Sequence, residues 1–294
     1  MKNFGGAFFF ICLFLGNIAG AQVRTVGNIN ERSVVKVALN FYSFNAPLME
    51  GGETLESVID FAASVGFAGV DITGYYFAGY PAAPADGEIY RIKYHAFRRG
   101  LEICGTGVRN DFALADSAAR ARERRLVKEW VVVAAKLGAS TLRIFSGGGV
   151  PEGYEWVEVA RWVAADIDEC AEFAKGYGVV LAVQNHNDFL RTAEDVERLF
   201  GLIRSDAVGL MLDVGSFRSD PYGEVERTVR YAVSWQIKET LFVGGVEAKT
   251  DVSRIMSIIR DSGYCGCLPV EIIGRGNERE RVRALFGEIG RGLK

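Results

Sequence analysis

Histidine is scarce in this chain of 294 residues, which contains only two, His95 and His186. So few imidazoles exclude a histidine-rich metal centre, because each imidazole supplies one ligand to an ion. An excess of either charge is also lacking: 34 Lys and Arg stand against 37 Asp and Glu, a formal net charge of -3. No basic cluster interleaved with aromatic residues occurs, so nucleic-acid binding is not predicted.

Cysteine is sparse as well, with five residues in the whole chain. Four of them lie beyond residue 21: Cys104, Cys170, Cys265 and Cys267. They are too few for a disulfide framework at this length, and no histidine is near enough in sequence to complete a zinc knuckle. These cysteines are therefore predicted to be small core residues.

No apolar run is long enough to span a bilayer as a helix. Residues 7–15 are all apolar, Lys2 precedes them, and small residues ending in Ala21 follow. This arrangement predicts a secretory signal peptide over residues 1–21, with export after cleavage and no membrane attachment of the mature protein. An uncleaved anchor is the alternative. Residues 22–33 are polar and unpatterned, which predicts a linker.

From residue 34 to the end, a short apolar run followed by an amphipathic helix recurs eight times. Helix signals mark the units, such as Thr54 as an N-cap, Gly66 as a stop, and Asp220 before Pro221. Eight alternating units in about 260 residues predict a single α/β domain over residues 34–294, a closed (β/α)8 TIM barrel. An open doubly wound sheet is the alternative, but the glycine-rich dinucleotide turn typical of it is lacking.

Polar side chains gather where the predicted strands end, which in such a barrel is the mouth that holds the active site. Alternation along a strand places one residue from each of strands five to eight at this mouth. These residues are Gln184, Asp213, Gln236 and Glu271. Two carboxylates and two amides form an all-oxygen set that predicts a Mn²⁺ or Mg²⁺ site. A hydrogen-bonded polar plug without metal is the alternative.

Further residues at the same ends are candidates for catalysis and substrate binding. His186 shares a face with Gln184 and is a candidate base near neutral pH. Lys238 is a candidate to polarise a carbonyl, or else a solvated lysine at a strand end. Four residues are predicted to bind a sugar: Arg143, Asn185, Tyr75 and Phe41. For the two aromatic residues, a hydrophobic lid is the alternative to packing against a sugar ring.

The order of the strand ends "VQNH", "LDVGS", "WQIKE" and "PVEII" resembles the xylose isomerase-like TIM barrels, which include the sugar phosphate isomerase/epimerase proteins. The resemblance implies a divalent metal held by Glu, Asp, His and Glu from strands five to eight. Asp213 and Glu271 match this set, whereas Gln184 and Gln236 replace the first Glu and the His. The resemblance also implies that the two glutamates form an acid/base pair. Because a glutamine cannot accept the proton, Glu271 and His186 are the predicted acid/base groups.

Together these features predict an exported isomerase or epimerase that removes a proton next to the carbonyl of a small sugar. A keto-glycoside lyase and a catalytically inactive sugar-binding barrel are the alternatives. A DNA-repair endonuclease of the same fold is excluded by the scarcity of histidine. The identity of the sugar, the reacting carbon and the oligomeric state are left open.

Overall fold

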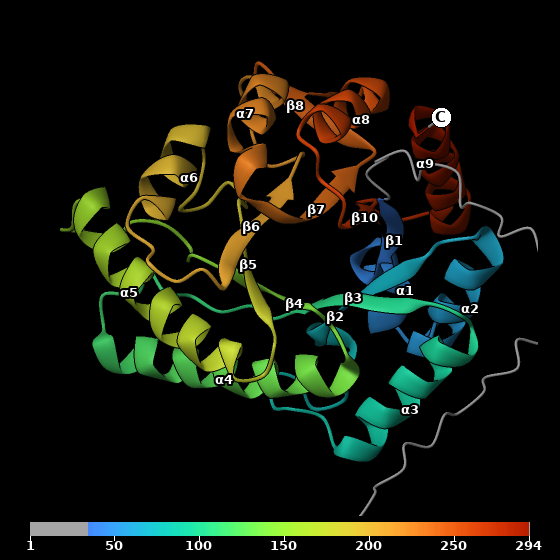
Figure 1. Ribbon diagram of the computed structural model, residues 1–294, viewed down its shortest axis with the longest axis horizontal. Helices are drawn as coiled ribbons and strands as arrows, with labels where there is room; N and C mark the ends of the chain where they lie inside the picture. The colour runs from blue at the N-terminus through green and yellow to red at the C-terminus, as the bar shows by residue number, and fades with distance from the viewer. Residues whose placement is uncertain (1–34, 294) are drawn as a thin grey trace, which may run out of the picture. The chain divides into compact units, whose positions relative to one another are not determined.

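Eight parallel strands close into a barrel in the computed structural model, which describes residues 35–293 (Figure 1). Around the barrel the order is β1-β10-β7-β6-β5-β4-β3-β2. The strands are β1 (Lys36–Asn40), β2 (Gly69–Thr73), β3 (Glu102–Gly107), β4 (Thr141–Phe145), β5 (Val180–Gln184), β6 (Val208–Asp213), β7 (Ala232–Lys238) and β10 (Cys267–Glu271). The predicted TIM barrel is confirmed. The predicted signal peptide and linker lie outside the described residues.

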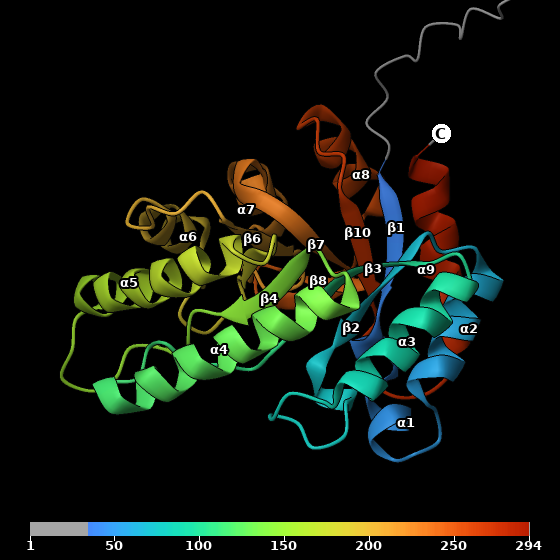
Figure 2. The same ribbon diagram turned by 60° about the horizontal axis from the view of Figure 1, so that its bottom comes forward.

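Helices follow the barrel strands and surround them, as Figure 2 shows for α2 to α5. They are α1 (Asn45–Met49), α2 (Leu55–Val65), α3 (Asp86–Arg98), α4 (Ser117–Leu137), α5 (Trp156–Lys175), α6 (Ala193–Phe200), α7 (Pro221–Thr228), α8 (Val252–Asp261) and α9 (Glu278–Gly292). Short 3-10 turns lie at Phe41–Phe44 (η1), Gly74–Tyr76 (η2) and Val229–Tyr231 (η3). No helix within residues 35–293 is both long and apolar enough to cross a membrane.

Local capping explains where several of these helices begin and end. The Thr54 side chain accepts a hydrogen bond from the Ser57 amide at the start of α2, and the Ser57 hydroxyl accepts one from the Thr54 amide. This reciprocal pair satisfies two amides that the helix leaves free. Gly66 ends α2 with φ of 101°, a conformation that glycine adopts without steric cost. Asp220 caps α7 with Pro221 in its first turn.

Several short elements of the described chain were missed by the sequence prediction, among them α1 and one hairpin. Between β7 and α8, a hairpin of β8 (Thr240–Val243) and β9 (Val246–Lys249) forms a separate two-stranded sheet. Gly244 and Gly245 make its turn with φ of 58° and 81°, the backbone that a two-residue hairpin turn requires. Their amides donate to the carbonyls of Ser219 and Arg218, which attaches the hairpin to the loop after β6.

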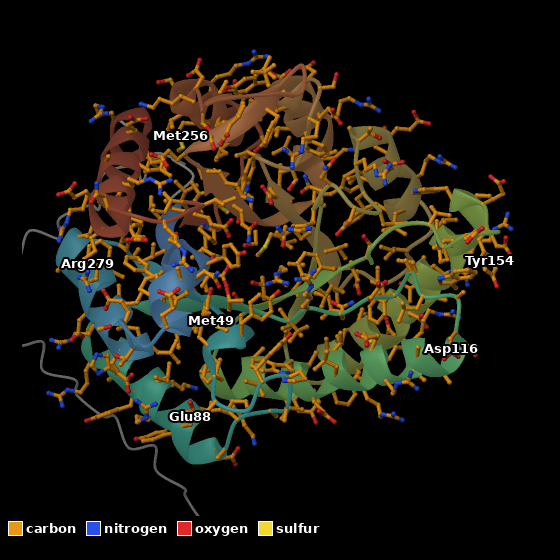
Figure 3. The ribbon with its side chains drawn as sticks, turned by 180° about the vertical axis from the view of Figure 1, so that it is seen from behind. Met49, Glu88, Asp116, Tyr154, Met256 and Arg279 are labelled. Atoms are coloured by element: carbon orange, nitrogen blue, oxygen red, sulfur yellow. The ribbon has the colours of Figure 1, made fainter. Side chains whose placement is uncertain are left out.

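The last helix packs against the first helices and completes the outer ring. Arg279 at the start of α9, labelled in Figure 3, pairs with Glu53 at 2.6 Å and lies 4.8 Å from the ring centre of Phe61 in α2. The core between the helices and the barrel includes two fully buried tryptophans, Trp130 of α4 and Trp235 of β7.

The predicted burial of the cysteines is confirmed only in part. Cys104 and Cys170 are buried as predicted, Cys267 is half-buried, and Cys265 is exposed, so the prediction for Cys265 is wrong. Cys265 lies in the turn before β10 and not in the strand itself, and turn residues face solvent.

Candidate functional site

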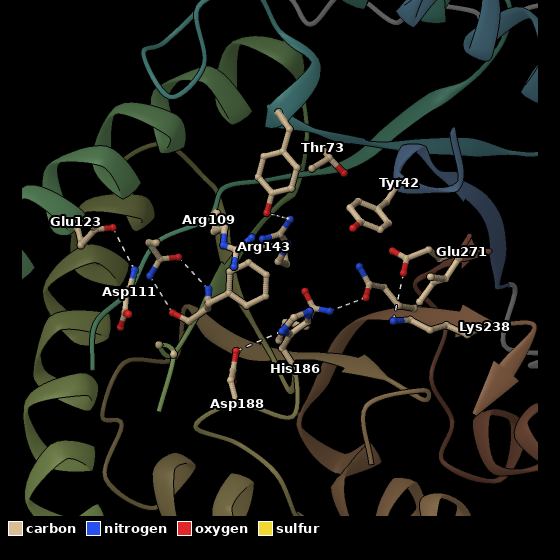
Figure 4. Close-up of a pocket in the computed structure, with 18 residues that line it drawn as sticks. Tyr42, Thr73, Arg109, Asp111, Glu123, Arg143, His186, Asp188, Lys238 and Glu271 are labelled. Atoms are coloured by element: carbon tan, nitrogen blue, oxygen red, sulfur yellow. Dashed lines mark hydrogen bonds and ion pairs between the residues drawn. The ribbon is translucent and has the colours of Figure 1, made fainter. Parts of the chain in front are cut away.

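A cavity of about 500 Å³ opens at the carboxyl ends of the barrel strands (Figure 4). Its volume is in the range of pockets that bind small molecules. The predicted residues that line it are Gln184, His186, Gln236, Lys238, Glu271, Arg143 and Tyr75. Residues that the sequence did not single out also line it, among them Tyr42, Thr73, Arg109, Asp111, Glu123 and Asp188.

Lys238 lies between two carboxylates on one side of this cavity. Its Nζ is 2.8 Å from Oδ2 of Asp213 and 3.2 Å from Oε1 of Glu271. Glu271 and Lys238 are register partners on β10 and β7, and Asp213 of β6 pairs with Gln236 two residues before Lys238. The three charged side chains are each less than 10% exposed. Strand alternation therefore brings a buried lysine and two acids from three adjacent strands to one point.

These contacts shift the ionisation of both partners. Burial lowers the pKa of Lys238, but attraction by Asp213 and Glu271 outweighs it, and the pKa is raised above its ordinary value. Burial raises the pKa of Glu271, Lys238 opposes this rise and Asp213 adds to it, so the net pKa is raised. Lys238 is thus held as an ammonium beside a carboxyl group that takes up protons readily.

Asp213 is fully buried below the cavity and does not line it. Its carboxylate accepts hydrogen bonds from Lys238, from the Gly215 amide at 2.9 Å, from the Ser216 hydroxyl at 2.8 Å and from the Gln184 amide group at 2.9 Å. So many donors satisfy the carboxylate without any ligand.

The amides predicted as ligands are bonded to the protein itself. Nε2 of Gln184 donates to Asp213 and also to Oε1 of Gln236, at 2.7 Å. Asn185 donates to the Asp213 carbonyl at 3.0 Å and accepts from the Asp213 amide at 2.9 Å. Asn185 is fully buried and does not line the cavity, so its predicted contact with substrate is corrected to a link between β5 and β6.

This donor set does not fit the predicted Mn²⁺ or Mg²⁺ ion. The point between the two carboxylates is filled by a buried ammonium, and the Gln184 amide turns its N–H groups, not its oxygen, toward Asp213 and Gln236. Among residues 35–293, one group of three acid, cysteine or histidine side chains is close enough to hold an ion: Glu102, Cys104 and Cys267, at the opposite end of the barrel. There Glu102 is already paired with Lys36.

Arg143 forms another part of the cavity wall from β4. Its guanidinium donates to the Val108 carbonyl and, at 3.2 Å, to the Tyr75 hydroxyl, and it lies 4.4 Å from the ring centre of Phe145. Gly107 is required beside it, because a Cβ there would lie 2.8 Å from Nε of Arg143. The arginine is therefore fixed in place, with Tyr75 as its neighbour in the cavity.

His186 and Asp188 lie on a loop after β5, below Arg143 in Figure 4. Nδ1 of His186 is 3.3 Å from Oδ2 of Asp188, and the ring meets the Phe145 ring edge-on at 4.9 Å between centres. Asn187 between them has φ of 59°, a left-handed conformation that asparagine tolerates better than most residues. The imidazole is half exposed and lines the cavity, so it is open to a ligand.

Phe41 is fully buried in the core and does not line the cavity, so its predicted contact with a sugar is wrong. Its neighbour Tyr42 lines the cavity instead. Both residues belong to the 3-10 turn η1, in which consecutive side chains do not follow the alternation of a strand.

Asp71 of β2 is a buried acid near the same end of the barrel. It accepts a hydrogen bond from Nδ2 of Asn40 at 3.0 Å. Burial raises the pKa of Asp71 from 3.8 to about 6, although the Arg143 guanidinium opposes the rise. The folded protein therefore binds this proton more tightly than the unfolded chain, and its stability falls as the pH rises from about 4 to above 6.

Asp71→Asn is expected to remove this pH dependence. A shift of about two pKa units corresponds to ~3 kcal/mol between the two ends of the titration. The stability of the variant relative to the wild type should therefore increase by ~2–3 kcal/mol from pH 4 to pH 7. Urea denaturation at both pH values measures it. A difference between the two proteins that stays constant with pH would contradict the assignment of this proton to Asp71.

A closed barrel of eight parallel strands, with a polar cavity at their carboxyl ends, defines a protein of the (β/α)8 class. Within that class, the model of the family described as xylose isomerase-like TIM barrel matches residues 59–287, and the chain belongs to this family. The resemblance noted from the strand ends is thereby confirmed. No curated protein sequence matches the chain significantly.

Solved structures share the fold at low sequence identity. L-ribulose 3-epimerase superposes with a TM-score of 0.74 at 18% identity, over 88% of this chain and 95% of the other. D-psicose 3-epimerase from Clostridium cellulolyticum H10, solved with D-tagatose, gives 0.71 at 15% identity, over 88% and 100%. A probable 3-DHS dehydratase from Bacillus anthracis gives 0.69 at 15%, over 87% and 99%.

Proposed function

We propose that the protein is a carbohydrate isomerase or epimerase that moves a proton on a carbon next to a sugar carbonyl. One observation carries this proposal: two acid/base pairs, Glu271 with Lys238 and His186 with Asp188, line the same cavity of about 500 Å³. Proton transfer to and from carbon requires a positioned base and acid of this kind. The fold neighbours named as sugar 3-epimerases support the same reaction class.

In the proposed reaction Glu271 takes the proton from the carbon next to the carbonyl. The electrons of the broken C–H bond form a carbon–carbon double bond, and the carbonyl electrons move to its oxygen, which gives an enediolate. His186 then returns a proton, either to the opposite face of the same carbon or to the neighbouring carbon. The first outcome is epimerisation. The second is isomerisation, in which the hydroxyl proton of the first carbon also passes to the former carbonyl oxygen, so that a carbonyl forms at the first carbon. Asp188 orients the imidazole through its contact with Nδ1.

The proposed substrate is a neutral sugar with a free carbonyl group, not a sugar phosphate. Arg143 is the buried cation of the opposite wall, and its guanidinium is already engaged by the Val108 carbonyl and the Tyr75 hydroxyl. Tyr75, whose hydroxyl can still donate, lines the cavity and is placed to meet a sugar hydroxyl instead. Export through residues 1–21, which remains a proposal, favours the same substrate class, since sugar phosphates are scarce outside the cell.

A deuterium-exchange experiment tests the proposal. The purified protein is incubated in D₂O with a panel of ketopentoses and ketohexoses, and proton NMR follows the C–H signal next to the carbonyl. Loss of that signal together with a new epimer or isomer is the expected result. An unsaturated product would indicate a β-eliminating lyase. Sugar binding in calorimetry without exchange would indicate a binding protein and overturn the proposal.

His186→Gln is expected to lower the rate of epimer or isomer formation by ~10²-fold, the lower end of the range for a positioned acid/base group. Glutamine keeps approximate size and hydrogen bonding but transfers no proton. The matched control is His95→Gln, because His95 lies on α3 outside the cavity and pairs with Asp60. The appearance of the product in proton NMR spectra measures both variants. Equal rates for His186→Gln and the wild type would assign the imidazole a structural role.

A further inference from the structure

The two carboxylates that the sequence predicts as metal ligands converge on a lysine. Nζ of Lys238 lies 2.8 Å from Asp213 and 3.2 Å from Glu271, and all three side chains are buried. Gly215 makes room for the lysine stem, because a Cβ at that position would lie 2.6 Å from Cδ of Lys238. The missing side chain at Gly215 thus allows Lys238 to reach the point between the two acids.

The hydrogen bonds around this point form a complete set with the ammonium in place. Oδ2 of Asp213 accepts from Gln184 and Ser216 as well as from Lys238. The oxygen of Gln236 accepts from Gln184 at 2.7 Å. A divalent ion requires several oxygen ligands that point at it, and neutral amides attract it weakly. Here the Gln184 amide, which lies between Asp213 and the Gln236 oxygen, presents N–H groups and not an oxygen ligand.

The charges of these side chains also disfavour a divalent ion at this point. Asp213 and Glu271 carry at most two negative charges, and Lys238 already neutralises one of them. A dication placed between the same carboxylates would meet the ammonium at contact distance, in a buried site where water screens poorly. We propose that the Lys238 ammonium is the permanent cation of this site, which replaces the divalent metal and excludes it.

The Lys238 ammonium also has a donor left for a ligand. The role given to this donor below rests on the proposed function. An ammonium has three N–H donors, of which Asp213 and Glu271 engage two. Lys238 lines the cavity, so its third donor is available to one ligand oxygen. The substrate carbonyl or its enediolate oxygen is the group that this donor would bind and stabilise.

Mn²⁺ binding, measured without any sugar, tests the replacement independently of the proposed reaction. The protein is treated with EDTA and dialysed, and electron paramagnetic resonance then counts free Mn²⁺ in a titration to millimolar concentration. The wild type is expected to bind no Mn²⁺ at this site and to keep its thermal midpoint. Lys238→Ala removes the ammonium. Mn²⁺ is expected to bind this variant at least ~10²-fold more tightly than it binds the wild type, because repulsion by a unit charge at a few ångströms is lost.

Two further variants control the titration. Lys249→Ala removes an exposed lysine that pairs with Glu288, and it should behave like the wild type. Lys238→Ala combined with Glu271→Gln removes one of the two carboxylates and should lose the acquired binding. One equivalent of Mn²⁺ bound by the wild type with micromolar affinity, and abolished by Asp213→Asn, would overturn the proposal. This wild-type measurement decides the matter even if Lys238→Ala does not fold.

Discussion

Glu271→Gln is expected to lower the exchange of the sugar C–H proton with solvent by ~10²- to 10⁴-fold, the range for loss of a positioned acid/base group. Glutamine has nearly the same shape, and its oxygen can still accept a hydrogen bond from Lys238, so the cavity should keep its form. The amide cannot carry the transferred proton. The reaction rate should therefore fall while sugar binding changes little. Proton NMR in D₂O gives the rate, and calorimetry gives the dissociation constant.

The matched control for this variant is Glu239→Gln. Glu239 directly follows β7, pairs with Arg281 and does not line the cavity. Its replacement should leave both the rate and the dissociation constant close to those of the wild type. If Glu271→Gln kept the wild-type rate, proton transfer would fall to His186 alone. If both Glu271→Gln and His186→Gln kept it, the proposed reaction would be wrong.

Asp213→Ala is expected to lower the free energy of unfolding by ~3–5 kcal/mol, the cost of removing one partner from a buried ion pair. The Lys238 ammonium would retain only Glu271 at 3.2 Å. The donors of Gln184, Ser216 and the Gly215 amide would lose their acceptor in a fully buried place. Each buried donor left without a partner adds its own penalty. Urea denaturation at pH 7 measures the change.

Two variants serve as comparisons for the loss of unfolding free energy expected for Asp213→Ala. Asp213→Asn keeps an acceptor oxygen and should cost less than Asp213→Ala. Asp206→Ala removes a carboxylate that is 89% exposed and pairs with Lys175 on the surface, and it should leave the denaturation midpoint nearly unchanged. A wild-type midpoint for Asp213→Ala would mean that the buried cluster contributes nothing to stability.

The fold was predictable from the sequence because each unit contains its own local signals. Thr54 and Asp220 cap helices as predicted, and each acts on amides within its own first turn. The hairpin β8–β9 was missed although Gly244-Gly245 between two short alternating runs is a hairpin signal. Its short strands sat where the eightfold pattern predicted only a connection to the next helix.

The sequence predicted the residues of the candidate site that lie on strands, where alternation applies, but not those that lie outside them. Gln236 and Lys238, two residues apart on β7, both line the cavity as the alternation requires. Tyr42 lies in a 3-10 turn beyond the strand, and Glu123 reaches the cavity from α4. Neither position follows from a local pattern, since tertiary packing brings these segments to the mouth.

The partners of Lys238 also determine which covalent chemistry this lysine lacks. An amine attacks a carbonyl carbon only when it is unprotonated and its lone pair is free. Lys238 is buried, donates to Asp213 and Glu271, and has a raised pKa, so its lone pair stays bound to a proton. A sugar carbonyl in this cavity would therefore meet a hydrogen-bond donor and not a nucleophile. Borohydride should consequently trap no imine between Lys238 and a bound keto-sugar.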